Sequence, residues 1–388
     1  MNLNRRQFAL ALAATAATPL AAQEPKFDVN VYRDGSKAIP VSLSGFTGEV
    51  ASTLRFDLEV AGCAVVSAEQ AQVLIHGTTG ARLEGFVSDR AKNYLLSKAY
   101  TGANQRQLAH AFADDVIFAL TQARGIARTR VAFKVKAANN TGEIYVADYD
   151  GHGAAPITAD RAIIAAPSWG PGSEWLAYTS YKLNNADIFS HNLVTGERHI
   201  VARYGGSNMS PAVAPGGRLV AMILSKGGKP DLYVADIHGR GLQQLTRARE
   251  GVASPCWSPD GQTICYVSSD DGPAQLYRIG ANGGTPQRIR TTGVFNATEP
   301  DWSPDGKWIA FTTQRGGFEV CIVPAGGGDV QSLGSGQDAT WAPNSRTLMF
   351  CKRGVGGPLS LSLLDVPTKR VKDVPLNLGN CSQPTWAR

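Results

Sequence analysis

The chain has 388 residues, of which 43% are hydrophobic and 18% charged, which excludes a disordered protein and suggests two domains. Its formal net charge of +6 comes from scattered basic residues with no lysine- or arginine-rich run, so we expect no nucleic-acid partner. The 42 glycines and 21 prolines are typical of short strands joined by turns, and they favour a mainly β fold.

The first 22 residues read as an export signal. Arg5 and Arg6 precede an apolar run at residues 8–20, and two alanines close the segment. The run is too short to span a bilayer, and no later segment is long enough. The paired arginines favour twin-arginine export, although an ordinary secretory signal can also carry them. We expect residues 1–22 to be removed and the product, with no cysteine near the cleavage position to carry a lipid, to be free in the periplasm.

Residues 23–127 are predicted to form a small α/β domain. Strands are predicted at residues 28–32, 39–44, 64–67 and 72–76, with a helix near residues 48–60 and two further strands before Tyr100. A second helix is predicted between Asn104 and Arg124, because an apolar residue recurs at every fourth position from Leu108 onward and Gly125 suits a helix end. Almost no linker follows, so we expect this domain to be rigidly related to the next.

The second part, residues 128–388, contains a repeat whose anchor position is usually tryptophan. Successive anchors are 39 to 45 residues apart, which is the length of a four-stranded propeller blade and longer than common helical repeats. The anchors are Trp169, Val213, Trp257, Trp302, Trp341 and Trp386.

A tight turn follows most anchors. Ser258-Pro259-Asp260-Gly261 has the residues that a type I turn prefers at its first, second and fourth positions, and residues 303–306 repeat it. Such a turn joins antiparallel strands, and a second strand, a Gly-rich loop, a third strand and a polar fourth strand follow. Four strands per repeat is the pattern of a propeller blade.

The first and last repeats are each incomplete. Residues 128–135 read as a second strand with no anchor tryptophan before it, whereas residues 383–388 supply an innermost strand with nothing after it. We therefore predict that residues 383–388 pair beside residues 130–135, which removes the open strand edges and closes a ring of six blades. A β-sandwich would not require this complementarity.

The six cysteines have no CxxC spacing and no zinc-like cluster. Cys256 and Cys265 flank one predicted hairpin and could face each other, and an oxidising compartment would allow them to pair. We favour buried free thiols, and we expect no metal or other cofactor.

Two sequence features resemble the TolB family, the periplasmic component of the Tol-Pal system of Gram-negative bacteria. The run LAHAFADDVIFALTQARGIARTRVAF, residues 108–133, is similar to that family's domain junction, and the PxWSPDGxxIxF repeats are similar to its propeller. The order of signal peptide, α/β domain and six blades matches across nearly the whole mature chain. Two departures are a shorter segment at residues 41–108 and the Gly170-Pro171-Gly172 turn, which lacks the usual Asp-Gly pair.

The resemblance implies a non-catalytic scaffold that supports outer-membrane integrity and constriction during cell division. Its propeller mouth would bind the peptidoglycan-associated lipoprotein Pal. Its N-terminal segment, about residues 23–33, would bind the inner-membrane protein TolA, and our candidate contacts there are Phe27, Val29 and Val31. We expect the protein to be a monomer.

The propeller mouth is predicted from the loops between second and third strands and between successive blades. Arginine suits protein interfaces through its planar fork, and two aspartates offer the opposite charge. Each of these residues taken singly can equally be an ordinary solvated loop residue. The candidate mouth residues are Arg203, Arg247, Arg249, Asp270, Asp271, Arg315 and Arg353.

Signatures of catalysis are sparse. The sequence has no GxSxG and no HExxH. His110 and Asp114, one helical turn apart, could share a metal, but without further ligands we favour a structural or exposed pair. An alternative is a periplasmic propeller enzyme, a metal-dependent lactonase or lyase, in which Glu299 and Asp301 share one strand face as metal ligands. A generic exported adaptor is a third possibility.

Overall fold

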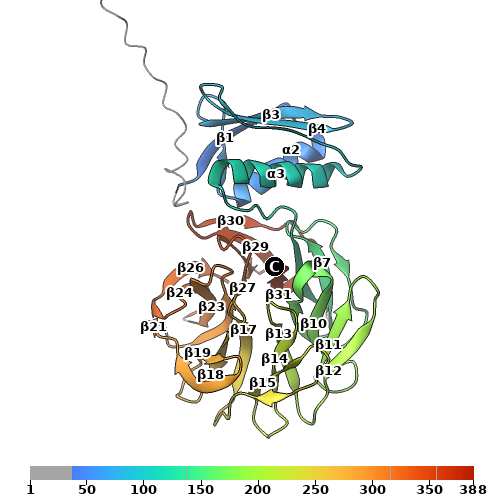
Figure 1. The fold of residues 1–388 in the computed structure, drawn as a ribbon, viewed down its shortest axis with the longest axis vertical. Coiled ribbons are helices and arrows are strands. Elements are labelled where there is room, and N and C mark those ends of the chain that lie inside the picture. Colours follow the sequence, from blue (N-terminus) through green and yellow to red (C-terminus); the bar gives the residue numbers. More distant parts are fainter. Residues whose placement is uncertain (1–36, 138, 315, 355) are drawn as a thin grey trace, which may run out of the picture.

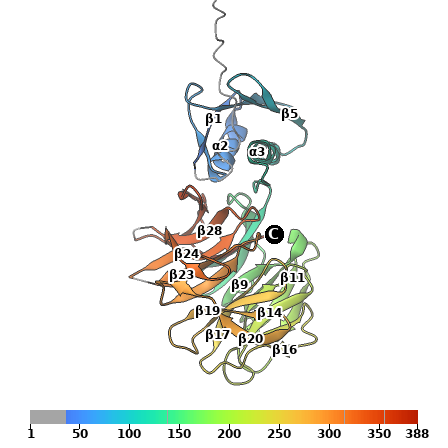
Figure 2. The ribbon, with the colours of Figure 1, turned by 60° about the vertical axis from the view of Figure 1, so that its left-hand side comes forward.

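The computed structural model describes residues 37–137, 139–314, 316–354 and 356–388. Over these ranges the chain forms an α/β part followed by six four-stranded antiparallel sheets arranged as a propeller (Figures 1 and 2). The predicted six-bladed, mainly β fold is confirmed. No helix within the described ranges has the length and apolar character needed to cross a membrane.

The α/β part is a five-stranded sheet with two helices. Its strands are β1 (Ile39–Ser44), β2 (Cys63–Val65), β3 (Val73–Thr79), β4 (Leu83–Asp89) and β5 (Tyr94–Tyr100), in the order β2-β1-β3-β4-β5. The helices are α2 (Gly48–Val60) and α3 (Gln105–Thr121), and they lie between this sheet and the propeller (Figure 1). Their inward side chains are buried, so the helices form the layer that faces the blades.

Helix α3 ends earlier than the sequence predicts. The Asn104 side chain caps its first turn by accepting from the Gln107 amide at 3.1 Å. At the other end Gln122 takes a left-handed φ of 59°, and its amide donates to the Phe118 carbonyl at 2.9 Å. The expected stop at Gly125 is therefore wrong, because an ordinary residue adopts the conformation that usually favours glycine.

Five blades are built from consecutive strands. Their strands are β9 (Ile164–Trp169), β10 (Trp175–Ser180), β11 (Asp187–Asn192) and β12 (Arg198–Ala202); β13 (Asn208–Val213), β14 (Leu219–Leu224), β15 (Asp231–Asp236) and β16 (Gln243–Gln244); β17 (Val252–Trp257), β18 (Thr263–Ser268), β19 (Gln275–Gly280) and β20 (Gly283–Arg288); β22 (Ala297–Trp302), β23 (Trp308–Gln314), β24 (Phe318–Pro324) and β26 (Gln331–Ser335); and β27 (Gln337–Trp341), β28 (Thr347–Arg353), β29 (Leu359–Asp365) and β30 (Arg370–Asp373). A short parallel pair, β21 (Thr291–Thr292) with β25 (Gly328–Asp329), lies outside these blades.

The sixth blade joins the two ends of the propeller sequence. Its strands are β31 (Asn380–Trp386), β6 (Arg130–Lys136), β7 (Gly142–Asp148) and β8 (Ala155–Pro156), in that order. Strand β31 runs antiparallel to β6, with Trp386 opposite Val131 and Cys381 opposite Val135. The predicted closure by the C-terminal strand is confirmed.

The predicted turns also form. The Gly261 amide donates to the Ser258 carbonyl at 2.9 Å, with Gly261 at a φ of 69°, and Gly306 repeats this bond with Ser303 at 2.9 Å. The turn after β9, which lacks the Asp-Gly pair, instead forms a short 3-10 helix at Pro171–Ser173. Both arrangements join the first two strands of a blade.

Candidate functional site

The innermost strands enclose a central cavity of about 530 Å³, which we call the channel cavity. It extends to the prolines of the turns that follow the anchors, at Pro171, Pro215, Pro259 and Pro304. Strands alternate in direction within a blade, so these turns and the loops between second and third strands lie at opposite ends. The channel cavity is thus biased toward the end with the first turns.

Each innermost strand has a β-bulge in the wall of the channel cavity. The pairing register shifts at this point in all six blades, and the residue at the shift has a left-handed φ of 49° to 55°. We call these six residues the bulge ring: Ala166, Ser210, Ser254, Glu299, Asp338 and Gln383.

Three members of the bulge ring connect neighbouring blades through hydrogen bonds. The Asp338 amide donates to Glu299 Oε2 at 3.1 Å, and the Gln383 amide donates to Asp338 Oδ2 at 3.1 Å. The Ala166 amide then donates to Gln383 Oε1 at 3.0 Å. Each acidic or amide side chain therefore satisfies the backbone of the next blade, and the series ends at Ala166, which has no polar side chain.

A second layer of contacts lies two residues beyond the bulge ring on the innermost strands. Asp301 Oδ2 accepts from the Thr340 hydroxyl at 3.0 Å and from the Trp341 amide at 2.7 Å, and it also pairs with the Arg388 guanidinium. Ser168 Oγ does the same in another blade by accepting from the Val213 amide at 3.0 Å. Polar residues inside the channel cavity thus hold adjacent blades together.

Glu299 and Asp301 both line the channel cavity, as the sequence suggested. Burial, reinforced by the neighbouring Asp338 carboxylate, raises the pKa of Glu299 to about 7. Glu299 Oε2 also accepts from the Thr312 hydroxyl at 2.8 Å. Because backbone amides, hydroxyls and Arg388 occupy these carboxylates, the residues present do not fit a metal ion.

The candidate mouth residues that the structure describes lie at the end of the blades opposite the first turns, and none of them lines the channel cavity. Arg249 donates to the Asp270 carbonyl at 3.0 Å and lies 3.5 Å from Asp271 Oδ1. Arg203 lies 3.5 Å from the buried Asp187 carboxylate. The loops therefore bring Arg249, Asp270 and Asp271 together.

Two candidate mouth residues are exposed and separate from that group. Arg247 is exposed and has no ion-pair partner within the described ranges. Arg353 is exposed and donates to the Gly357 carbonyl at 3.1 Å. Arg315, the candidate contacts Phe27, Val29 and Val31, and the export signal lie outside the described residues.

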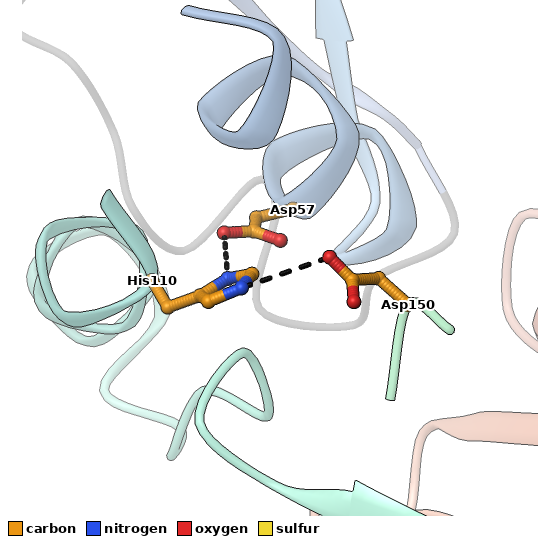
Figure 3. Close-up of side chains that lie close together, drawn as sticks. All are labelled: Asp57, His110 and Asp150. Atoms are coloured by element: carbon orange, nitrogen blue, oxygen red, sulfur yellow. Dashed lines mark hydrogen bonds and ion pairs between the residues drawn. The ribbon is translucent and has the colours of Figure 1, made fainter. Parts of the chain in front are cut away.

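A second polar site lies where the α/β part meets the propeller. His110 of α3 is placed between Asp57 of α2 and Asp150, which follows β7 (Figure 3). The His110 Nδ1 to Asp57 Oδ2 distance is 2.8 Å, and the Nε2 to Asp150 Oδ2 distance is 3.6 Å. Their side chains are only 1% to 3% exposed. We call these three residues the interface cluster.

The interface cluster is the one group of three or more potential ligands that lie close enough to share a metal ion in the described part of the chain. Both of its carboxylates are already engaged, since Arg106 pairs with Asp150 and the Tyr149 hydroxyl donates to Asp57 Oδ1 at 2.6 Å. A guanidinium beside Asp150 opposes a second cation there. These residues do not fit a metal ion.

Sequence reasoning placed His110 with Asp114 and missed the other two members of the interface cluster. Asp114 instead accepts from the Ala127 amide at 2.8 Å and from Arg128 Nε at 2.9 Å, which agrees with its predicted structural role. Asp57 is separated from His110 by 53 residues. The only sequence feature that could have drawn attention to Asp57 is its position, as an acidic residue, on the apolar face of a predicted helix.

The sequence of this chain is similar to a known protein family. The family model described as the TolB beta propeller domain matches residues 118–388. The Tol-Pal system protein TolB of Bordetella pertussis is 30% identical over 196 residues, covering 50% of this chain and 44% of that protein, and the Bordetella bronchiseptica protein matches equally. The chain therefore spans less than half the length of these curated relatives.

Solved structures share the fold. The crystal structure of TolB from Acinetobacter baumannii aligns with a TM-score of 0.83 at 22% identity, covering 90% of this chain and 97% of that one. A putative TolB from Agrobacterium tumefaciens aligns with a TM-score of 0.51 at 18% identity, covering 63% and 88% of the two chains.

Proposed function

The chain belongs to the TolB β-propeller domain family, and from that premise we propose that it is a non-enzymatic, periplasmic scaffold of a Tol-Pal system. The observation that carries this proposal is the family match across the whole propeller, on a closed ring with an exposed rim of loops. The curated relatives are named as Tol-Pal system proteins, which supports the same role. The scaffold would support outer-membrane integrity and constriction during division.

We propose that the candidate mouth residues bind a Pal-like lipoprotein. Those within the described ranges lie at the end of the blades away from the interface cluster, so a partner there would not collide with the α/β part. Arg247 and Arg353 are exposed, and arginine contributes strongly to protein interfaces through its planar donors. Arg203, Arg249, Asp270, Asp271 and Arg315 would complete the docking surface.

A binding measurement tests this assignment. The soluble domain of Pal from the same organism is titrated with the wild-type chain and with Arg247→Glu and Arg353→Glu. Charge reversal at a contact is expected to weaken binding at least about tenfold, because it introduces repulsion as well as removing donors. Lys307→Glu is the matched control, since Lys307 is 74% exposed in a turn at the other end of the blades.

The control should bind Pal within about twofold of wild type. Absence of any wild-type binding at micromolar Pal would contradict the partner assignment. Equal weakening by all three variants would point to a general charge effect and not to the mouth.

We propose separately that residues 23–33 bind a TolA-like inner-membrane protein, with Phe27, Val29 and Val31 as contacts. Deleting residues 23–33 is expected to remove retention by the TolA domain while Pal binding stays unchanged. Loss of both partners would instead indicate that the deletion damages the fold.

A metal-dependent lactonase or lyase receives no support from the channel cavity. Its carboxylates serve the backbone of neighbouring blades, so we assign them a structural role. A generic adaptor for a different exported partner would share the fold and differ in the Pal titration.

A further inference from the structure

The interface cluster is the buried charged group where the α/β part packs on the propeller. Asp57 and His110 belong to the two helices of the α/β part, whereas Asp150 belongs to the turn after β7 of the closing blade (Figure 3). Tyr149, which donates to Asp57, lies in the same turn. Arg106, also on α3, pairs with Asp150. Docking of the α/β part on the propeller therefore brings Asp150 up to the His110 ring.

The charge of this buried group depends on His110. The two carboxylates carry two negative charges, and Arg106 supplies one permanent positive charge. A protonated His110 balances the remaining negative charge, whereas a neutral His110 leaves it uncompensated in a site where the side chains of Asp57 and Asp150 are 2% and 1% exposed. Uncompensated buried charge is costly, so the docked arrangement favours the imidazolium.

The hydrogen-bond geometry of His110 also favours its protonated form. His110 Nδ1 lies 2.8 Å from Asp57 Oδ2 at hydrogen-bond distance, and the ring nitrogen must donate to an ionised Asp57 because a carboxylate only accepts. In a neutral ring Nε2 would then carry a lone pair, and it would face Asp150 Oδ2 at 3.6 Å. Nε2 is buried and has no hydrogen-bond partner at normal distance in the described part of the chain. Only protonation turns this facing pair from repulsive to attractive.

We propose that the interface cluster is a proton-dependent lock that holds the α/β part against the propeller when His110 is protonated and releases it when His110 loses its proton.

The pKa directions agree with this lock. Burial lowers the pKa of His110, but the hydrogen bond to Asp57 and the charges of Asp57 and Asp150 outweigh burial, so its pKa is raised overall. Burial raises the pKa of Asp57, against the hydrogen bonds from His110 and Tyr149. Since docking raises the proton affinity of the group, rising pH favours separation of the two parts.

The other charged side chains around the interface cluster form ion pairs or hydrogen bonds of their own. On α2, Glu49 Oε1 lies 3.4 Å from Arg106 Nη1, and the Thr53 hydroxyl accepts a hydrogen bond from the same guanidinium at 3.1 Å. Asp114 on α3 pairs with Arg128. The Tyr149 phenol has a pKa well above its ordinary value, first because of burial and then because of Asp57, so it stays neutral. His110 is therefore the group that changes charge near neutral pH.

A second set of contacts keeps the parts connected when the lock opens. Lys372 pairs with Glu59, and Arg370 Nη1 donates to the Cys63 carbonyl at 3.0 Å. These contacts join α2 and β2 to the fifth blade. Opening is thus expected at the closing blade, with the contacts on the fifth blade acting as the hinge, and not as dissociation of the α/β part.

Hydrogen exchange of the purified full chain, followed by mass spectrometry from about pH 6 to 9, tests the lock. After correction for intrinsic exchange rates, opening measured in α3 and residues 144–152 is expected to increase as the pH rises from the ordinary histidine pKa of 6.5 to the raised pKa of the docked His110. The slope is up to about tenfold per pH unit, as for one linked proton, and opening should level off above the raised pKa. His110→Gln should open more at pH 6 and lose the pH dependence. His238→Gln, at an exposed surface histidine, should behave as wild type.

A direct titration keeps the proposal testable if His110→Gln does not fold. Histidine nitrogen signals of the wild-type chain are expected to show a His110 midpoint above the ordinary histidine value of 6.5, and Asp150→Asn should lower that midpoint. Opening that does not depend on pH, or a His110 midpoint below the ordinary histidine value of 6.5, overturns the lock. Zinc could instead slow hydrogen exchange in the wild type but not in His110→Gln, and a chelator could reverse this effect. That result would show a metal site and would also overturn the lock.

Discussion

The indole of Trp386 stacks on the phenol ring of Tyr149, with ring centroids 6.2 Å apart and planes inclined by 28°. Trp386 lies on the strand that closes the propeller, and Tyr149 reaches Asp57 of the α/β part through its hydroxyl. The Trp386 Nε1 also donates to Thr129 Oγ1 at 2.8 Å. Closure of the propeller and docking of the α/β part therefore share one hydrophobic core.

Trp386→Ala is expected to destabilise the protein by about 3–5 kcal/mol, because it leaves a large cavity in that shared core. Trp386 is 2% exposed. Chemical denaturation should show the loss, and deletion of residues 381–388 should abolish cooperative unfolding altogether. Phe295→Ala is the control, since Phe295 is 80% exposed and its truncation should change stability by less than about 0.5 kcal/mol. An intact unfolding midpoint after the deletion would falsify the closure.

Glu299 should make stability depend on pH in a definite direction. Its pKa is raised from 4.5 to about 7, so the folded state binds this proton more tightly than the unfolded state does. Stability is therefore expected to fall as the pH rises from about 4.5 to about 7, at roughly 1.4 kcal/mol per unit of pKa difference. Glu299→Gln keeps an acceptor for the Asp338 amide and should flatten this decline. Glu197→Gln, at an exposed position, should leave the pH profile unchanged.

The bulge ring should reject β-branched side chains. Ser254 has a φ of 49°, a conformation that glycine adopts freely and that valine strongly disfavours. Ser254→Val is expected to cost about 1–3 kcal/mol relative to Ser254→Gly. Denaturation of the two variants measures this difference at one position. Equal stability would mean that the bulge is not held in the left-handed conformation.

All six thiols should be unreactive in the folded protein. Every cysteine is buried and free, as the sequence favoured, and Cys256 lies opposite Cys265 in the strand register. Burial raises the pKa of Cys63 to about 12 and that of Cys321 to about 11, which suppresses the reactive thiolate. A thiol reagent at pH 8 should label none before denaturation and six afterwards. A count of four after denaturation would show that Cys256 and Cys265 are joined.

The candidate site was only partly accessible from the sequence. Glu299 and Asp301 were singled out as residues of one strand face, and both do line the channel cavity. Their engagement by the Trp341 amide and by Arg388 was not predicted, because those partners come from other blades. The sequence pattern also gave no sign that Ser254 adopts a left-handed φ, since serine is common in ordinary strands.

The propeller could be predicted because its signals are local and repeated. The bond between Gly261 and Ser258 spans three residues, and an anchor tryptophan recurs in nearly every blade, so turn chemistry and period alone determine blade number and closure. The interface cluster could not be predicted in this way. Asp57, His110 and Asp150 are far apart in the chain, and their charges interact only because folding buries them within one small volume. Proximity and exclusion of water, which set the charge of His110, are properties of the tertiary structure alone.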